Sequence, residues 1–206
     1  MDRNLYQRLA LFLGQENDLA QEKAAELAYA IEILLINGLN LILTMLIGFL
    51  LGVLPGTIVC ILVATAYRHT AGGAHSRNPW TCAIATMIIF PALAYLGTYV
   101  AAGPDVIRWA IVATAGLIGI YAVYCYAPVD SAEAPIISPV RRNRLRRYSA
   151  FVIGILVTML LLLEVISPIW LYGHIIQVCA ALTVIWVSFN LTNNAATIWC
   201  MLDNQH

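Results

Sequence analysis

The sequence predicts an all-α, polytopic integral membrane protein with about six transmembrane helices after an amphipathic segment. Of its 206 residues, 61% are hydrophobic and 11% are charged, whereas soluble domains carry about 25% charged residues. The apolar residues form six runs, and five of the ten Arg lie in one stretch between the fourth and fifth runs. This chain has too little charge to cover a water-facing surface, which argues against a soluble helical domain.

The first element, residues 1–31, is predicted to be an interfacial helix that leads into the first crossing. Leu5, Leu9 and Phe12 follow helical spacing, and polar residues lie between them. An amphipathic segment of this kind lies in the plane of a membrane surface.

Six apolar runs follow. A helix needs about 20 apolar residues to cross a bilayer. Four runs come close to that length, the fifth is marginal, and the second spans at most about 22 Å by helix rise. The second run begins at a Pro-Gly turn and ends at Arg68 and His69. The runs are 33–54, 56–70, 80–102, 106–127, 149–166 and 169–190.

The orientation follows from the basic residues, because short Arg-rich loops stay in the cytoplasm. Five Arg between positions 141 and 147 follow the fourth run, which predicts a Pro-containing, basic cytoplasmic loop over 128–148. Alternation then places segment 68–79 and both termini in the cytoplasm. Glu164 falls near the outer end of the fifth run, where we expect it at the interface.

Charge and cysteine spacing limit the partners. The net charge is zero, so we expect membrane lipids but no nucleic acid as partners. No cofactor or metal is predicted, because the five cysteines have no paired spacing. The sequence leaves the oligomeric state open, with a homodimer as one alternative. The cysteines are Cys60, Cys82, Cys125, Cys179 and Cys200.

The stretch RHTAGGAHSRNPWTC, from Arg68 to Cys82, is rich in polar residues although the chain as a whole is mostly apolar. Asn78 and Pro79 predict a helix start, because Asn caps helices and Pro suits the first helical position. Cys82 would then lie in the first turn. Free backbone N–H groups and the positive end of the helix dipole favour the thiolate there.

His75 lies seven residues before Cys82, and a turn through Ser76 would bring its imidazole to the sulfur. Such a pair activates a thiol nucleophile. Gly72 and Gly73 would let the main chain approach a bound peptide or present N–H groups to an oxyanion. A His and a Cys at this spacing also occur by chance. No third residue clearly orients His75, because Asn78 is occupied by capping and Ser76 is weak, so a dyad is expected.

The pattern R-x4-G-x-H-x6-C, formed by Arg68, Gly73, His75 and Cys82, resembles the accessory gene regulator B (AgrB) family of membrane cysteine endopeptidases. Chain length, the amphipathic start and the basic residues after the fourth run are also similar. The resemblance implies that Cys82 is the nucleophile, that His75 is its catalytic partner, and that Arg68 and Gly73 support them.

The resemblance further implies that the protein cuts a short AgrD-like propeptide on the cytoplasmic side through an acyl-enzyme thioester. A Cys or Ser of the same peptide would capture the acyl group as a thiolactone or a lactone, the precursor of a signalling peptide. Which ring forms is left open. The basic stretch would fix topology and contact lipid headgroups or dock the propeptide's acidic tail. It comprises Arg141, Arg142, Arg144, Arg146 and Arg147.

Two non-enzymatic alternatives stay open. A small peptide transporter would use the same region without cutting, and it predicts repeated halves, which the sequence does not display. A membrane sensor subunit would use residues 68–82 as a lipid- or partner-binding turn.

Overall fold

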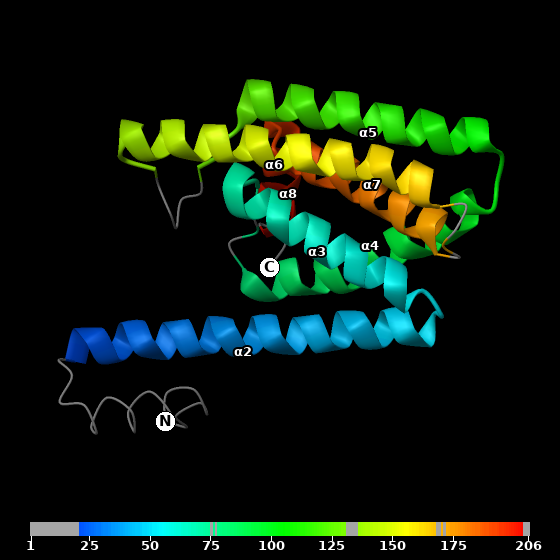
Figure 1. Ribbon diagram of the computed structural model, residues 1–206. Coiled ribbons are helices and arrows are strands. Elements are labelled where there is room, and N and C mark those ends of the chain that lie inside the picture. The colour runs from blue at the N-terminus through cyan, green and yellow to red at the C-terminus, as the bar shows by residue number, and fades with distance from the viewer. Residues whose placement is uncertain are drawn as a thin grey trace.

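The computed structural model describes residues 21–74, 76, 78–130, 136–167, 170 and 172–203. These residues form a bundle of helices and no strand (Figure 1). The all-α, polytopic prediction is therefore confirmed. The helices are α2 (Gln21–Leu50), α3 (Leu54–Ala71), α4 (Pro79–Ala101), α5 (Asp105–Tyr126), α6 (Pro139–Ile166), α7 (Gly173–Asn190) and α8 (Asn193–Asp203).

Successive helices from α2 to α7 run in alternating directions, so the chain passes back and forth between two ends of the bundle (Figure 1). The α3–α4 connection, the α5–α6 connection and α8 lie at one end, which we call the site end. The α2–α3, α4–α5 and α6–α7 connections lie at the other. This alternation places the polar segment after α3 and the basic stretch after α5 at the same end.

Five of the described helices are long and apolar enough to cross a membrane, which makes the chain a multi-pass membrane protein. They correspond to five of the six predicted crossings. The exception is α3, the predicted short element, which has 18 residues and carries Arg68 and His69 in its last turn. Its length is about 27 Å by helix rise. It packs against α2, α4, α6 and α7 inside the bundle.

Three predicted segments differ in extent from the helices of the structure. Residues 21–31 begin α2 and continue into its apolar part without a break, while residues 1–20 of the predicted interfacial segment lie outside the described residues. Segment 68–79 is a loop only in part, because α3 continues to Ala71 and α4 begins at Pro79. The predicted loop 128–148 ends earlier, because α6 begins at Pro139 and includes the whole basic stretch. The first turns of α6 extend beyond the bundle (Figure 1).

The centre of the bundle is α7, which packs against α3, α4, α5 and α6. Small residues let its neighbours approach closely, as is usual between helices in membranes. A Cβ atom on Gly97 of α4 would lie 2.5 Å from Cys179 Sγ of α7. Buried polar groups are also paired across the core, since Tyr67 Oη lies 3.1 Å from Ser188 Oγ and donates to the Gly119 carbonyl at 3.2 Å.

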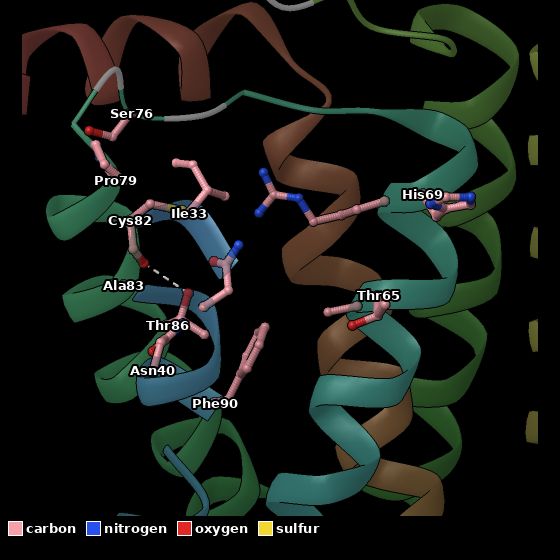
Figure 2. Close-up of a pocket in the computed structure, with 13 residues that line it drawn as sticks. Ile33, Asn40, Thr65, His69, Ser76, Pro79, Cys82, Ala83, Thr86 and Phe90 are labelled. Atoms are coloured by element: carbon pink, nitrogen blue, oxygen red, sulfur yellow. Dashed lines mark hydrogen bonds between the residues drawn. The ribbon is translucent and has the colours of Figure 1, made fainter. Parts of the chain in front are cut away.

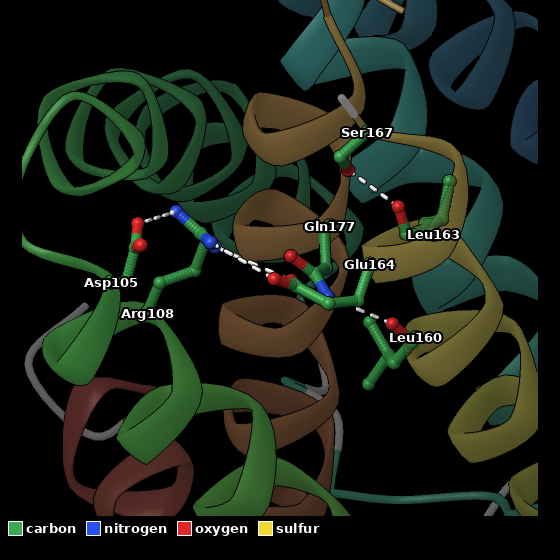
Figure 3. Close-up of polar contacts among 7 residues, drawn as sticks. All are labelled: Asp105, Arg108, Leu160, Leu163, Glu164, Ser167 and Gln177. Atoms are coloured by element: carbon green, nitrogen blue, oxygen red, sulfur yellow. Dashed lines mark hydrogen bonds and ion pairs between the residues drawn. The ribbon is translucent and has the colours of Figure 1, made fainter. Parts of the chain in front are cut away.

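An ion pair joins α5 to α6 at the end opposite the site end (Figure 3). Arg108 donates from Nη2 and Nε to the two carboxylate oxygens of Glu164, at 3.0 and 3.4 Å, and from Nη1 to Asp105 at 2.8 Å. The Arg108 side chain is 5% exposed and that of Glu164 is 19% exposed, whereas that of Asp105 is 78% exposed. The Glu164 carboxylate is therefore partly buried and paired with Arg108 of α5, a pairing that the sequence analysis did not predict.

We predict that Glu164→Gln lowers the free energy of unfolding by about 2 kcal/mol, because it removes charged hydrogen bonds to a buried guanidinium. The matched control, Asp105→Asn, removes the exposed partner of the same Arg108 and should cost less than about 1 kcal/mol. Unfolding in detergent micelles with increasing SDS measures both. Equal losses in the two variants would contradict the interpretation.

Candidate active site

Residues 72–74, which follow α3, are held by main-chain hydrogen bonds on two sides. The Ala71 carbonyl accepts from Val129 N at 2.9 Å, and the Asn190 carbonyl accepts from Ala74 N at 2.8 Å. Val129 belongs to the α5–α6 connection and Asn190 ends α7. The segment is therefore tied to two distant parts of the chain.

The glycine pair fits this position for a steric reason. Gly72 has a φ of 75° and Gly73 a φ of 137°, values that side chains rarely adopt. A Cβ atom on Gly72 would lie within 2.3 Å of the Val129 carbonyl oxygen, and one on Gly73 would lie 3.3 Å from the Asn190 carbonyl oxygen. The two glycines therefore allow the segment to pack closely against the main chain of Val129 and Asn190.

The predicted start of α4 is confirmed. Asn78 caps the helix, accepting at Oδ1 from Trp80 N at 3.0 Å, and Pro79 is the first helical residue. Ser76 stabilises the same turn, since its hydroxyl contacts the Asn78 carbonyl at 3.0 Å and the Asn78 N–H at 3.1 Å. Through these contacts, Ser76 and Asn78 stabilise the turn before α4.

Cys82 lies in the first turns of α4, as predicted, but fewer free N–H groups surround it than expected. Its own N–H donates to the Asn78 carbonyl at 3.3 Å, Trp80 N is capped, and Pro79 has no N–H. The helix dipole still places positive potential there.

The Cys82 side chain is partly exposed and lines a cavity of about 680 Å³ between α2, α3 and α4. Figure 2 shows Cys82 and Thr86 on α4 on one side of this cavity and Thr65 on α3 on the other. The full lining is Ile33, Asn37, Asn40, Ala64, Thr65, Arg68, His69, Ser76, Pro79, Cys82, Ala83, Thr86 and Phe90.

Arg68 connects the segment after α3 to the cavity. Its Nη2 donates to the Ala74 carbonyl at 2.8 Å, and its charge interacts electrostatically with Cys82. A cation beside a thiol stabilises the thiolate form. The alternative prediction, an Arg68 that extends to the membrane surface, fits these contacts less well.

His75, the predicted catalytic partner, and Arg77 lie outside the described residues, so the distance from His75 to Cys82 remains a prediction. Ser76, which follows His75 in the chain, lines the cavity. Among the described residues, no group of three or more His, Cys, Asp or Glu side chains lies close enough to hold a metal ion.

Comparison of the sequence with known proteins identifies a family. The model of the accessory gene regulator B family matches residues 6–191. The chain belongs to the accessory gene regulator B (AgrB) family. It is therefore a component of the accessory gene regulator type of quorum-sensing system.

The relatives in this family are distant in sequence. The chain is 25% identical to accessory gene regulator protein B of Staphylococcus aureus (strain bovine RF122 / ET3-1) over 160 residues, which cover 78% of this chain and 82% of that protein. It is 24% identical to the protein of the same name from Staphylococcus lugdunensis over 178 residues, 86% of this chain and 92% of that protein. No solved structure gives a significant match.

The basic stretch of this AgrB-family chain lies on α6, separate from the cavity lining. Arg142 forms an ion pair with Asp130, and Arg146 donates to the Tyr124 carbonyl at 3.1 Å. In the described part of the chain, the exposed side chains of Arg141, Arg144 and Arg147 make no ion pair.

The sequence analysis missed the contribution of α2 to the site. Asn37 and Asn40 line the same cavity as Cys82, from the first crossing helix. The sequence did contain an indication of this role, because the two carboxamides lie three residues apart in an otherwise apolar run. Polar residues within a crossing helix usually face a cavity or a neighbouring helix.

We predict that Gly72→Ala unfolds or displaces the segment after α3, because the added Cβ meets the Val129 carbonyl. Gly52→Ala is the matched control, since Gly52 has a φ of 70° and no neighbour within 4 Å of an added Cβ. Gly52→Ala should cost about 1 kcal/mol from backbone conformation alone, and Gly72→Ala about 1–3 kcal/mol more from overpacking. Thermal unfolding in detergent compares the two, and equal costs would contradict the assignment.

Proposed function

We propose that the protein is a cysteine endopeptidase that cleaves a short AgrD-like propeptide and cyclises it to the precursor of a quorum-sensing signal. The observation that carries the proposal is the partly exposed Cys82, which lines a cavity at the start of a membrane helix together with Arg68. Family membership supports a role in this signalling system.

In the first step, Cys82 gives its thiol proton to His75, and the resulting thiolate attacks a peptide carbonyl and forms a tetrahedral intermediate. The C–N bond then breaks, and the tail of the propeptide leaves as an amine that takes its proton from His75. This leaves an acyl-enzyme thioester on Cys82. Covalent catalysis of this kind splits one difficult step into two easier ones.

In the second step, a Cys thiol or Ser hydroxyl of the same peptide gives its proton to His75 and attacks the thioester carbonyl. The bond to Cys82 Sγ breaks, the sulfur leaves as a thiolate, and a thiolactone or lactone ring forms. Ring closure must be faster than hydrolysis. A cavity that excludes water protects the thioester, and holding the internal nucleophile against it supplies a high effective concentration.

We assign the site end to the cytoplasm of a bacterial cell, because the Arg-rich start of α6 lies there. The propeptide would then be cut before any export. Arg141 lies in the first turn of α6, where a cation is unfavourable at the positive end of the dipole, and Arg144 and Arg147 follow it along the helix. Their positions suit binding of an anionic lipid surface or an acidic propeptide tail.

We predict that N-ethylmaleimide alkylates Cys82 at neutral pH faster than it alkylates Cys125 and Cys200, although both of these are more exposed. His75→Ala should slow the Cys82 reaction about tenfold, because the thiolate is the reactive form. Peptide mapping by mass spectrometry follows all five cysteines in one sample. Equal and slow labelling of all five would favour a transporter or a sensor subunit.

The matching activity test is co-expression with a propeptide gene, which we expect next to this one as a short reading frame that encodes an amphipathic leader, a central Cys or Ser and an acidic tail. Mass spectrometry should detect the cyclic product with the wild-type protein and not with Cys82→Ala.

We also predict that changing Arg141, Arg144 and Arg147 together to Glu abolishes propeptide processing, because an acidic tail would be repelled rather than bound. Arg142→Gln is the control, since it alters the residue that pairs with Asp130. Cell fractionation and a topology reporter on the C-terminus separate a docking defect from a topology defect. Unchanged processing with unchanged insertion would rule out docking at this stretch.

A further inference from the structure

One face of α2 lines a cavity near one end of the helix and packs against α3 near the other. Ile33, Asn37 and Asn40 line the cavity of Cys82. Further along the same face, Thr44 is fully buried, and a Cβ on Gly48 would lie 2.5 Å from Thr57 Oγ1 of α3. The helix is therefore packed tightly against α3 near its C-terminal end and lines an open cavity near Asn37.

The two carboxamides are unusual at this place. Asn37 and Asn40 fall in the part of α2 that is apolar and long enough to cross a membrane, Ala30–Leu50. An amide in an apolar environment costs about 1–3 kcal/mol when it lacks a hydrogen bond. Asn40 Oδ1 lies 3.2 Å from Thr44 Oγ1, whereas the Asn37 side chain makes no hydrogen bond to any described residue. Both line the cavity, and Asn37 is exposed, so its carboxamide is free to bind an occupant of the cavity.

The spacing of the carboxamides matches a peptide main chain. Each carboxamide offers a donor and an acceptor, as a peptide group does. Residues three apart on a helix have Cβ atoms about 5–6 Å apart, and alternate residues of an extended chain repeat at about 6.6 Å. The two amides can therefore bind peptide groups two residues apart on one extended strand. The cavity volume of about 680 Å³ falls within the range of ligand sites.

We propose that Asn37 and Asn40 are positioning residues, which bind the main chain of an extended peptide segment and hold one of its carbonyl groups against Cys82 Sγ. The inference rests on the proposed function and names the part of the site that binds substrate. Main-chain hydrogen bonds tolerate many side chains, while the apolar Ile33 and Phe90 in the same cavity contact the side chains of the bound segment.

The test uses the purified full-length protein in detergent and two reagents that alkylate a thiol by displacing chloride. One is a set of N-acetyl tetrapeptidyl chloromethyl ketones that differ in the residue next to the ketone. The other is chloroacetamide, which has no peptide chain. Rates of Cys82 modification come from mass spectrometry. In the wild type, the best peptidyl reagents should show a large rate advantage over chloroacetamide.

Asn37→Ala and Asn40→Ala should each reduce this advantage about tenfold, the effect of one lost hydrogen bond, with the chloroacetamide rate changed less than twofold. The unchanged chloroacetamide rate reports that the site is folded. Asn37→Gln keeps the carboxamide and should recover part of the advantage. The matched control is Asn194→Ala on the exposed surface of α8, outside the cavity, which should change neither rate.

The outcomes separate the two proposals. If Cys82 is reactive but no peptidyl reagent has a rate advantage over chloroacetamide, the inference is overturned and the proposed function stands. The same conclusion follows if both alanine variants retain the rate advantage of the wild type. A Cys82 that reacts with neither class of reagent overturns the proposed function and the inference with it.

Discussion

The geometry of the site end depends on one constraint, which is that the main chain between α3 and α4 must find hydrogen-bond partners at the end of a membrane bundle. Buried backbone groups without partners are costly, and more so where water is scarce. Ala71 and Ala74 meet this constraint through Val129 and Asn190. Asn190 is itself fixed, because its Oδ1 accepts from Trp199 Nε1 of α8 at 2.9 Å. The ends of α3 and α7, the α5–α6 connection and α8 therefore meet at one place.

This junction positions the candidate active site. The same segment continues into the Ser76–Asn78 turn that starts α4, and α4 carries Cys82 into the cavity. Arg68 reinforces the arrangement from the other side, since it binds the Ala74 carbonyl and its charge acts on Cys82. Main-chain and capping contacts outside α4 thus determine where the thiol lies.

The two ends of the bundle are built differently. At the far end, Gly48 packs against Thr57, and Arg108 joins α5 to α6 through Glu164. At the site end, polar side chains of α2 line an open cavity instead. Tight packing at one end holds the helices together, while the cavity at the other end leaves open space beside Cys82.

Sequence alone determined what depends on local chemistry. The all-α membrane fold followed from apolar runs long enough to cross a bilayer, and the start of α4 followed from Asn78 and Pro79, because capping depends on neighbouring residues. Only the tertiary structure decided which distant groups meet. It placed Asn37 and Asn40 in the same cavity lining as Cys82, paired Arg108 with Glu164, and set Val129 against Gly72. Helix periodicity says which face a residue occupies, but packing of the whole chain decides what that face meets.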